Sequence, residues 1–455
     1  MKERILLFII IFGLTTFIYV FQNYTDWGLA ILVCLMGLYF VSASVATKVK
    51  ARKTQNKPIE KDENYKPFIS VMIPAHNEDS VISDTIARVF KMNYPNFEVI
   101  VIDDRSSDNT AQVITQLEPM YGGRLKTLIR PNDAFPGKSA VLNDALKIAK
   151  GEAILVFDAD AQMDADFLTS MVYELQPKDV GAVQARKVIK NKDINLLTKC
   201  QNNEMTIDTS CQVTRDAVKG AVELRGNGEL IKRAALDDIG GWNDFTITDD
   251  LDMSTRLHIK GWDIRFCKDT VVYEEGIVYL SPLYRQRRRW LEGTIRRYLE
   301  YFWDIMTSKK MSLRVRLDTI AYISEFIMPA WFIIELIILI LKIFIKDAPV
   351  NTLMSSVIMG CIIGAGFMLS CRYALRKYDN MNRVDAFTQA VITSAYLLLI
   401  WFPLVLFIGT KILFMKKDMK WGKTAHGLVR REHAIQRAKE KIRKAKEELK
   451  RILQK

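Results

Sequence analysis

The stretch Ala153-Ile-Leu-Val-Phe-Asp-Ala-Asp160 places five consecutive apolar residues directly before an acidic pair. A continuous apolar run of this length is typical of a strand that is buried on both faces. The segment before it, Ser139 to Lys150, has the apolar spacing of a helix. We therefore expect a helix followed by a buried strand, with Asp158 and Asp160 just beyond the carboxyl end of that strand.

The same order of elements occurs upstream. Phe68 to Ile73 and Phe97 to Ile102 have buried-strand patterns, and Leu125 to Ile129 is a further candidate strand. Helical patterns cover Ser80 to Met92 and Ala111 to Leu117. Strands that alternate with helices predict an α/β fold with a mostly parallel sheet and helices on both faces. Such sheets bind ligands at the carboxyl ends of their strands.

Polar side chains gather at these expected strand ends. Pro74-Ala-His-Asn-Glu78 follows the first strand, Asp103-Asp104 follows the second, and Asp158-Ala-Asp160 follows the last. Carboxylates bind hard cations such as Mg²⁺ or Mn²⁺, and these cations bind diphosphates. Each motif alone also fits an acidic surface loop. Their occurrence at successive strand ends favours a site for a nucleotide diphosphate.

Two motifs lie further along the chain. Phe245-Thr-Ile-Thr-Asp-Asp-Leu-Asp252 places three carboxylates before the helical pattern Met253 to Lys260. Asp250 is a candidate general base for an acceptor hydroxyl, although acidic residues also stabilise the start of a helix. Gln286-Arg-Arg-Arg-Trp290 combines guanidinium groups that can neutralise a diphosphate with an indole that can pack on a sugar. A basic anchor beside a membrane is the alternative for this motif.

Five stretches are nearly free of charge, and each is close to or above the roughly 20 residues that cross a bilayer. They are Ile5–Phe21, Trp27–Val45, Thr319–Leu341, Val350–Ser370 and Ala386–Leu413. We expect a transmembrane hairpin over 1–47, a soluble domain over 48–310, transmembrane or interface helices over 311–415, and a basic tail over 416–455. This is the pattern of a multi-pass integral membrane protein.

Basic residues orient this arrangement. Lys2 and Arg4 precede the first span, and five lysines and arginines between Lys48 and Lys57 follow the second, so the positive-inside rule predicts a cytoplasmic soluble domain. Five spans would place the basic tail outside, so one stretch is expected to lie along the interface or to re-enter. Ala386 to Leu413, which contains Pro403, is a candidate.

The net charge of +13 also bears on the partners of the chain. Much of this charge lies beside the spans, between Arg285 and Arg297, and in the tail. This placement favours anionic lipid headgroups over nucleic acid. The six cysteines have no metal-like spacing, and in a cytoplasmic setting we expect free thiols.

From about Phe68 to Tyr298 these motifs, in this order, resemble those of the family-2 glycosyltransferases, which have the GT-A fold. The resemblance implies an inverting transfer from a UDP-sugar with Mg²⁺ or Mn²⁺. It also implies a role for each motif. Pro74, Ala75, Asn77, Glu78 and Asp104 would hold uridine, Lys138 would lie near the phosphates, Asp158 would contact the nucleotide, and Asp160 with Asp158 would bind the metal. Asp250 would be the base beside Asp249, which replaces the family's glutamate, and Gln286, Arg289 and Trp290 match its QxxRW motif.

The acceptor has two candidates. QxxRW with flanking spans also occurs in processive synthases of cellulose, chitin, hyaluronan and poly-N-acetylglucosamine, whose acceptor is a growing glycan. Longer strings, such as Glu223-Leu-Arg-Gly-Asn-Gly228 and Gly240-Gly-Trp-Asn243, resemble the cyanobacterial β-monoglucosyldiacylglycerol synthases. Those enzymes place glucose from UDP-glucose on diacylglycerol. We therefore favour diacylglycerol, with Gly226, Asn227 and Gly228 beside it, and keep a polymer synthase as the alternative.

Overall fold

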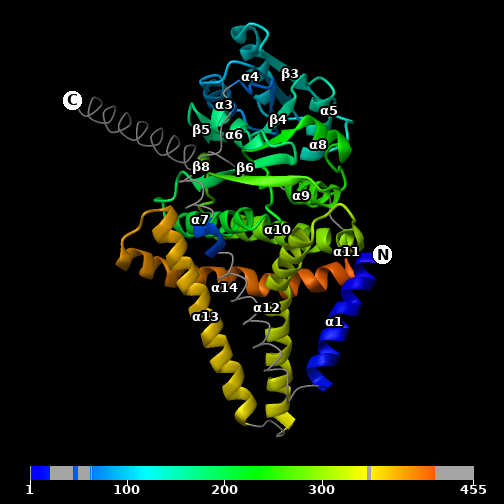
Figure 1. The fold of residues 1–455 in the computed structure, drawn as a ribbon, viewed down its shortest axis with the longest axis vertical. Helices are drawn as coiled ribbons and strands as arrows, with labels where there is room; N and C mark the ends of the chain where they lie inside the picture. Colours follow the sequence, from blue (N-terminus) through cyan, green and yellow to red (C-terminus); the bar gives the residue numbers. More distant parts are fainter. Residues whose placement is uncertain (1, 21–44, 50–61, 63, 346–349, 416–455) are drawn as a thin grey trace, which may run out of the picture.

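The computed structural model of the chain describes residues 2–20, 45–49, 62, 64–345 and 350–415. Nearly all of the expected second span, 27–45, and the whole basic tail, 416–455, lie outside these residues. Figure 1 shows an α/β domain with a group of long helices beneath it. The expected division into a folded domain and long apolar helices therefore has a visible counterpart in the described part of the chain.

The strands and helices expected between residues 68 and 157 are confirmed, with bounds that differ by a few residues. The strands are β1 (Ile69–Ala75), β2 (Phe97–Asp103), β3 (Leu125–Ile129), β4 (Ala153–Val156), β5 (Gln162–Met163), β6 (Val180–Ile189), β7 (Glu229–Lys232) and β8 (Asp263–Glu274). The helices of the domain are α3 (Ile82–Val89), α4 (Thr110–Leu117), η1 (Glu118–Tyr121), α5 (Lys138–Leu146), α6 (Phe167–Leu175), α7 (Leu196–Ala217), α8 (Arg233–Asp238), α9 (Asp249–Lys260), α10 (Leu280–Glu300) and α11 (Phe302–Thr307). The long helices are α1 (Lys2–Val20), α12 (Leu313–Ile345), α13 (Val350–Tyr378) and α14 (Arg383–Phe414).

The strands form one eight-stranded sheet in the order β3-β2-β1-β4-β7-β6-β8-β5. The half from β3 to β4 is parallel throughout, as the alternation of elements predicts. The other half is mixed, because β7 is antiparallel to both β4 and β6, and β5 is antiparallel to β8. The apolar runs from which we predicted strands end at Phe157. The sequence therefore provides no prediction for the later strands or for their directions.

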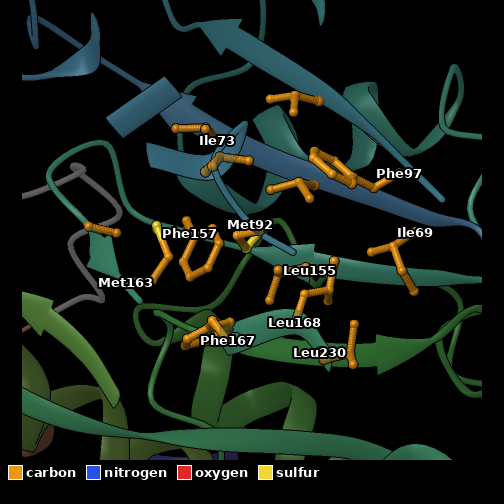
Figure 2. Packing of buried hydrophobic residues seen from close by; sticks show 14 of the residues in the cluster. Ile69, Ile73, Met92, Phe97, Leu155, Phe157, Met163, Phe167, Leu168 and Leu230 are labelled. Atoms are coloured by element: carbon orange, nitrogen blue, oxygen red, sulfur yellow. The ribbon is translucent and has the colours of Figure 1, made fainter. Parts of the chain in front are cut away.

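Apolar side chains cover both faces of the sheet, and this explains the continuous apolar runs in the sequence. All seven residues of β1 and all seven of β2 are buried. Ile69 and Ile73 face a cluster built with α3, α4 and α6, part of which Figure 2 shows. Met72 and Ile100 face the opposite cluster, built with α5, α8 and α9. Each such side chain stabilises the fold by about 1.5–3 kcal/mol on burial, so these two layers fix the sheet edge on which the site stands.

The helices beneath the domain run in two directions. Helices α1, α12 and α13 extend away from the sheet, whereas α14 runs crosswise to them under α7 and α10 (Figure 1). One side of α14 is buried against these domain helices through Tyr396, Ile400, Leu404 and Ile408. The other side carries exposed apolar residues, among them Leu399, which is 75% exposed.

Length and composition alone do not show which of these helices cross a membrane. Among the described residues, α1 and α14 are long and apolar enough to cross a membrane, a test that a buried core helix or a signal sequence also passes. The crosswise course of α14 is the structural observation that bears on the stretch from Ala386 to Leu413, for which an interfacial or a re-entrant position stays a prediction.

Buried ion pairs fasten the long helices to the domain. Lys411 of α14 is paired with Glu292 of α10, which also accepts from Arg296 at 3.1 Å. Arg296 is in turn paired with Glu3 of α1 at 3.2 Å. Such pairs cost desolvation but fix relative position, because removing one partner leaves a buried charge alone.

Candidate active site

Strand pairing brings the expected motifs to one edge of the sheet. Ala75 is opposite Asp103 in the parallel strands β1 and β2, so the segments after these strands leave the sheet side by side. Val156 at the end of β4 is opposite Glu229 at the start of the antiparallel strand β7. The loop before β7 therefore lies beside the segment that follows β4.

The segment after β1 is held by hydrogen bonds to the segment after β2. Asn77 has a left-handed φ of 57°, and its side-chain oxygen accepts from the backbone N–H groups of Ser107 and Asp108 at 2.6 and 3.3 Å. The backbone N–H of Glu78 donates to the hydroxyl of Thr110 at 2.7 Å. These contacts explain why an asparagine, which tolerates this φ, precedes the glutamate.

Asp104 is fully buried and paired with two arginines. Its carboxylate lies 2.9 Å from Nε of Arg105 and 2.7 Å from a terminal nitrogen of Arg130. Pro74 and Ala75, also expected at the donor site, are buried within β1. Asp104 thus sets the position of two guanidinium groups at the strand ends, besides any contact that its own carboxylate makes.

Lys138 connects the segment after β4 to the loop before β7. It is the first residue of α5, and its Nζ donates to Oδ1 of Asp158 and to the carbonyl of Gly226, both at 2.6 Å. Burial alone lowers the pKa of Lys138, but the nearby carboxylates of Asp158, Asp249 and Glu229 outweigh it and hold the pKa above its ordinary range. The site therefore contains a fixed positive charge, which suits a diphosphate.

Asp249 and Asp250 form the first turn of α9, with Thr248 as the residue before the helix. The sequence analysis placed these carboxylates before the helix, and the structure corrects that boundary. Burial, and next the neighbouring Asp249, raise the pKa of Asp250 to about 6. A Cβ atom on Gly226, whose φ is 75°, would lie 3.2 Å from Oδ2 of Asp250. Glycine at this position therefore lets the loop approach the carboxylate closely.

Two polar residues of the loop and strand after Gly226 are completely buried. The side-chain oxygen of Asn227 accepts from the backbone N–H of Asp158 at 3.2 Å, and Glu229 accepts from that of Gly226 at 3.2 Å. Burial, and next Asp249 and Asp250, raise the pKa of Glu229 to about 8. The sequence analysis missed Glu229. The available signal was a glutamate at the start of the apolar run Leu230-Ile231.

Asp160 lies beyond Asp158 and accepts from the backbone N–H of Glu275 at 3.3 Å. Within the described ranges, no three His, Cys, Asp or Glu side chains are placed to hold a metal by themselves. Mg²⁺ commonly takes only one or two protein carboxylates and completes its shell with substrate phosphates and water. Asp158 and Asp160 are oxygen donors and fit such a shared site.

One face of α10 packs on the start of α9. Arg289 donates to the carbonyl of Ile247 at 3.4 Å, and Arg297 donates to that of Leu251 at 3.1 Å. Between them, a Cβ on Gly293 would lie 2.5 Å from Cγ2 of Thr248. Residues four apart share a helix face, so this face joins the Gln286–Trp290 motif to Asp249 and Asp250.

The mixed eight-stranded sheet with its helices is the GT-A fold, the fold of the glycosyltransferases that the chain resembles. A mannosyltransferase from Pyrobaculum calidifontis, solved with GDP-mannose and Mn²⁺, is similar in fold with a TM-score of 0.53, at 20% identity over 82% of this chain and 99% of that one. Residues 67–293 match the model described as "Glycosyltransferase like family 2". The chain belongs to glycosyltransferase family 2.

Two kinds of named synthase are among the curated relatives to which the chain is similar. A β-monoglucosyldiacylglycerol synthase from Trichormus variabilis is 36% identical over 374 residues, which cover 79% of this chain and 76% of that protein. A poly-β-1,6-N-acetyl-D-glucosamine synthase from Staphylococcus epidermidis is 29% identical over 285 residues, which cover 62% and 68%. Both resemblances expected from the motifs are confirmed.

Proposed function

We propose that this chain is an inverting, metal-dependent enzyme that transfers glucose from UDP-glucose to diacylglycerol and forms β-monoglucosyldiacylglycerol. The observation that carries the proposal is the placement of a half-buried carboxylate, Asp250, against the Gly226 loop that also contacts Lys138. This arrangement puts a base close to a group suited to phosphate. Similarity to the lipid-glucosylating relatives extends over more of the chain than similarity to the polymer synthase, and this supports the lipid acceptor.

Asp250 takes the proton from the acceptor hydroxyl as its oxygen attacks the anomeric carbon of the donor sugar. The bond from this carbon to the diphosphate breaks, and UDP leaves. The fixed charges of Lys138 and Arg289 stabilise the negative charge on the leaving group. A single displacement inverts the anomeric carbon, so an α-linked donor gives a β-linked product.

A divalent cation on Asp158 and Asp160 fits the donor set described above. Bound there, it would neutralise the diphosphate charge, as Mg²⁺ and Mn²⁺ do in other phosphate sites. Asp158 would then lie between two positive charges, the cation and Lys138. Its Oδ1 is 2.6 Å from Nζ of Lys138, which supports a role at the nucleotide rather than as a metal ligand alone.

We place the α/β domain on the cytoplasmic side, with α1, α12 and α13 entering the bilayer and α14 along its surface. The course of the helices in Figure 1 and the basic residues near the spans support this arrangement. A diacylglycerol hydroxyl lies at the headgroup level of the membrane. The crosswise α14 under α7 and α10 brings the floor of the domain to that level.

The test uses the purified full chain in detergent with Mg²⁺ and radiolabelled UDP-glucose, with and without diacylglycerol. We expect one labelled product that requires diacylglycerol and migrates as a monoglucosyl lipid on thin-layer chromatography. Labelled material that stays at the origin and is degraded by a β-glucanase would instead establish a polymer synthase. UDP-N-acetylglucosamine in a parallel reaction tests the choice of sugar.

A further inference from the structure

Arg287 lies inside the Gln286–Trp290 motif, at one of the two positions that the QxxRW pattern leaves open. Its side chain is only 2% exposed. One terminal nitrogen donates to the side-chain oxygen of Gln286 at 2.5 Å, and the guanidinium carbon lies 4.2 Å from the centre of the Trp290 ring. Arg287 therefore contacts both ends of the motif.

The other side of this guanidinium is held by Glu204 of α7. Nε and the second terminal nitrogen of Arg287 donate to Oε2 of Glu204 at 3.2 and 2.7 Å. The hydroxyl of Tyr396 donates to the same oxygen at 3.2 Å, and the indole of Trp401 donates to Oε1 at 3.2 Å. Both aromatic residues belong to α14. A single carboxylate, whose side chain is 13% exposed, thus joins α7, α10 and α14.

Packing α14 against the domain does not by itself require this set of hydrogen bonds, because apolar contacts alone can hold two helices together. The interface of α14 with the domain has an apolar cluster and other polar contacts, namely the pair of Lys411 with Glu292 and the hydrogen bonds of Asn203 to Gln389 and Thr393. Neither of these polar contacts reaches the Gln286–Trp290 motif. A buried ion pair contributes little net stability compared with well-packed apolar residues, but it fixes geometry because each charge needs its partner. The fork shape of arginine lets it bind a carboxylate on one side while it donates to Gln286 and stacks on Trp290.

We propose that Arg287 and Glu204 are positioning residues, which orient Gln286 and Trp290 toward the donor and make that orientation depend on how α14 is seated against the domain. This inference rests on the proposed function, and on the donor-side role that the family's QxxRW motif implies for Gln286 and Trp290. Tyr396 and Trp401 link the position of α14 to the motif, because both donate to Glu204, which in turn holds Arg287. The interface between membrane surface and domain therefore takes part in substrate orientation.

Arg287→Lys separates positioning from structure. Lysine keeps the positive charge for Glu204, but it cannot also donate to Gln286 and stack flat on Trp290. We expect kcat/KM for UDP-glucose to fall about ten- to a hundredfold, as misplaced groups do in other enzymes. The inhibition constant of free UDP should change less than twofold, because UDP lacks the sugar that Trp290 faces.

Lys411→Met is the matched control. It removes another buried ion pair between α14 and α10, the pair with Glu292, without touching Glu204 or Arg287. Glu292 keeps Arg296 as its partner, and the apolar side of α14 still packs on the domain, so we expect kcat/KM to stay within about twofold of the unchanged chain. Tyr396→Phe removes one hydroxyl only and should give a smaller loss than Arg287→Lys, with the same selectivity for UDP-glucose over UDP. It serves as the second variant if Arg287→Lys lowers expression.

Turnover is followed as UDP release, which needs no assumption about the acceptor. If the unchanged chain releases UDP without forming a glucolipid, the proposed acceptor is wrong, while the comparison of variants still holds. Unchanged kcat/KM in both Arg287→Lys and Tyr396→Phe would overturn the positioning role. Equal losses in these variants and in Lys411→Met would also overturn it, because they would reflect general loosening of the α10–α14 interface.

Discussion

At the scale of single residues, the chemistry depends on carboxylates whose surroundings differ. Asp250 is half-buried beside Asp249 and faces the Gly226 loop, whereas Asp158 is paired with Lys138. Burial and a like charge keep the pKa of Asp250 higher than that of an ordinary aspartate, and a higher pKa makes a better proton acceptor. In the proposed mechanism, the pairing with lysine gives Asp158 a different task, at the phosphate end of the donor.

Asp250→Asn tests the base directly. The amide has nearly the same size and cannot accept the proton, so we expect kcat to fall about 10²- to 10⁴-fold. UDP affinity, measured by isothermal titration calorimetry, should change little because Asp250 does not face the diphosphate in our proposal. Turnover within a factor of a few of the unchanged chain would remove Asp250 from the mechanism.

The pH dependence should report the same group. Asp250 must be ionised to act as a base, and its pKa of about 6 places the acid limb of kcat/KM near pH 6, with activity lost as the pH falls below it. Asp249 raises this pKa, so Asp249→Asn should move the limb to lower pH. A limb that stays in place, or moves to higher pH, would mean that another group controls it.

Asp160 carries the prediction on the metal. Asp160→Ala should raise the Mg²⁺ concentration for half-maximal activity at least about tenfold, because one of the two protein oxygens proposed for the cation is lost. Asp164→Ala is the control, since Asp164 is an exposed acid four residues further on. Magnesium titrations that superimpose for the two variants would exclude Asp160 as a ligand.

At the scale of elements, the site depends on how closely α10 packs on the start of α9. Gly293→Ala would add a Cβ 2.5 Å from Cγ2 of Thr248 and force the helices apart. We expect the free energy of unfolding to fall by about 1–3 kcal/mol, as for other overpacked sites, and kcat to fall with it. Thermal unfolding and initial rates measure both effects.

Gly409→Ala is the control for this change, because Gly409 is also inside a helix, α14. No described heavy atom beyond its own neighbours in the helix lies within 4 Å of the Cβ that alanine would add there. Since alanine is the better helix former by about 0.5–1 kcal/mol, we expect unchanged or slightly higher stability. A Gly293→Ala variant as stable and active as Gly409→Ala would show that the α9–α10 contact is not tight.

The helices and strands up to Phe157 are a part of the structure that could be predicted from the sequence. The strands through Phe157 were identified because burial on both faces leaves an uninterrupted apolar run, which a single sequence displays directly. Asp158 and Asp250 were found because acidic residues stand out beside such runs. Glu229 and Glu204 were missed because their importance comes from what folding brings against them. Glu229 lies close to Lys138, and Glu204 binds Arg287. Both partners are distant in sequence, so no local spacing reveals these contacts.

At the scale of the whole molecule, the proposed membrane topology depends on whether α14 crosses the bilayer or lies along its surface. By composition it resembles a span, yet it crosses beneath α7 and α10 and buries one side against them (Figure 1). This apolar side holds α14 against the domain, and the ion pair of Lys411 with Glu292 adds one contact near the end of the helix. If α14 lies at the membrane surface, the spans proposed are α1, residues 27–45, α12 and α13. An even number of spans returns the chain to the side on which it began.

Reporter fusions test this arrangement. We expect a reporter fused after Met415 to lie in the cytoplasm, on the same side as the amino terminus, because Lys416, Lys417, Lys420 and Lys423 obey the positive-inside rule only there. Green fluorescent protein should therefore fluoresce at this position and alkaline phosphatase should be inactive. The connection at residues 346–349, between α12 and α13, is the control and should give the opposite pair of results. Active phosphatase after Met415 would mean that α14 spans the bilayer, and the link from its seating to Glu204 and Arg287 would then need a different geometry from the one in Figure 1.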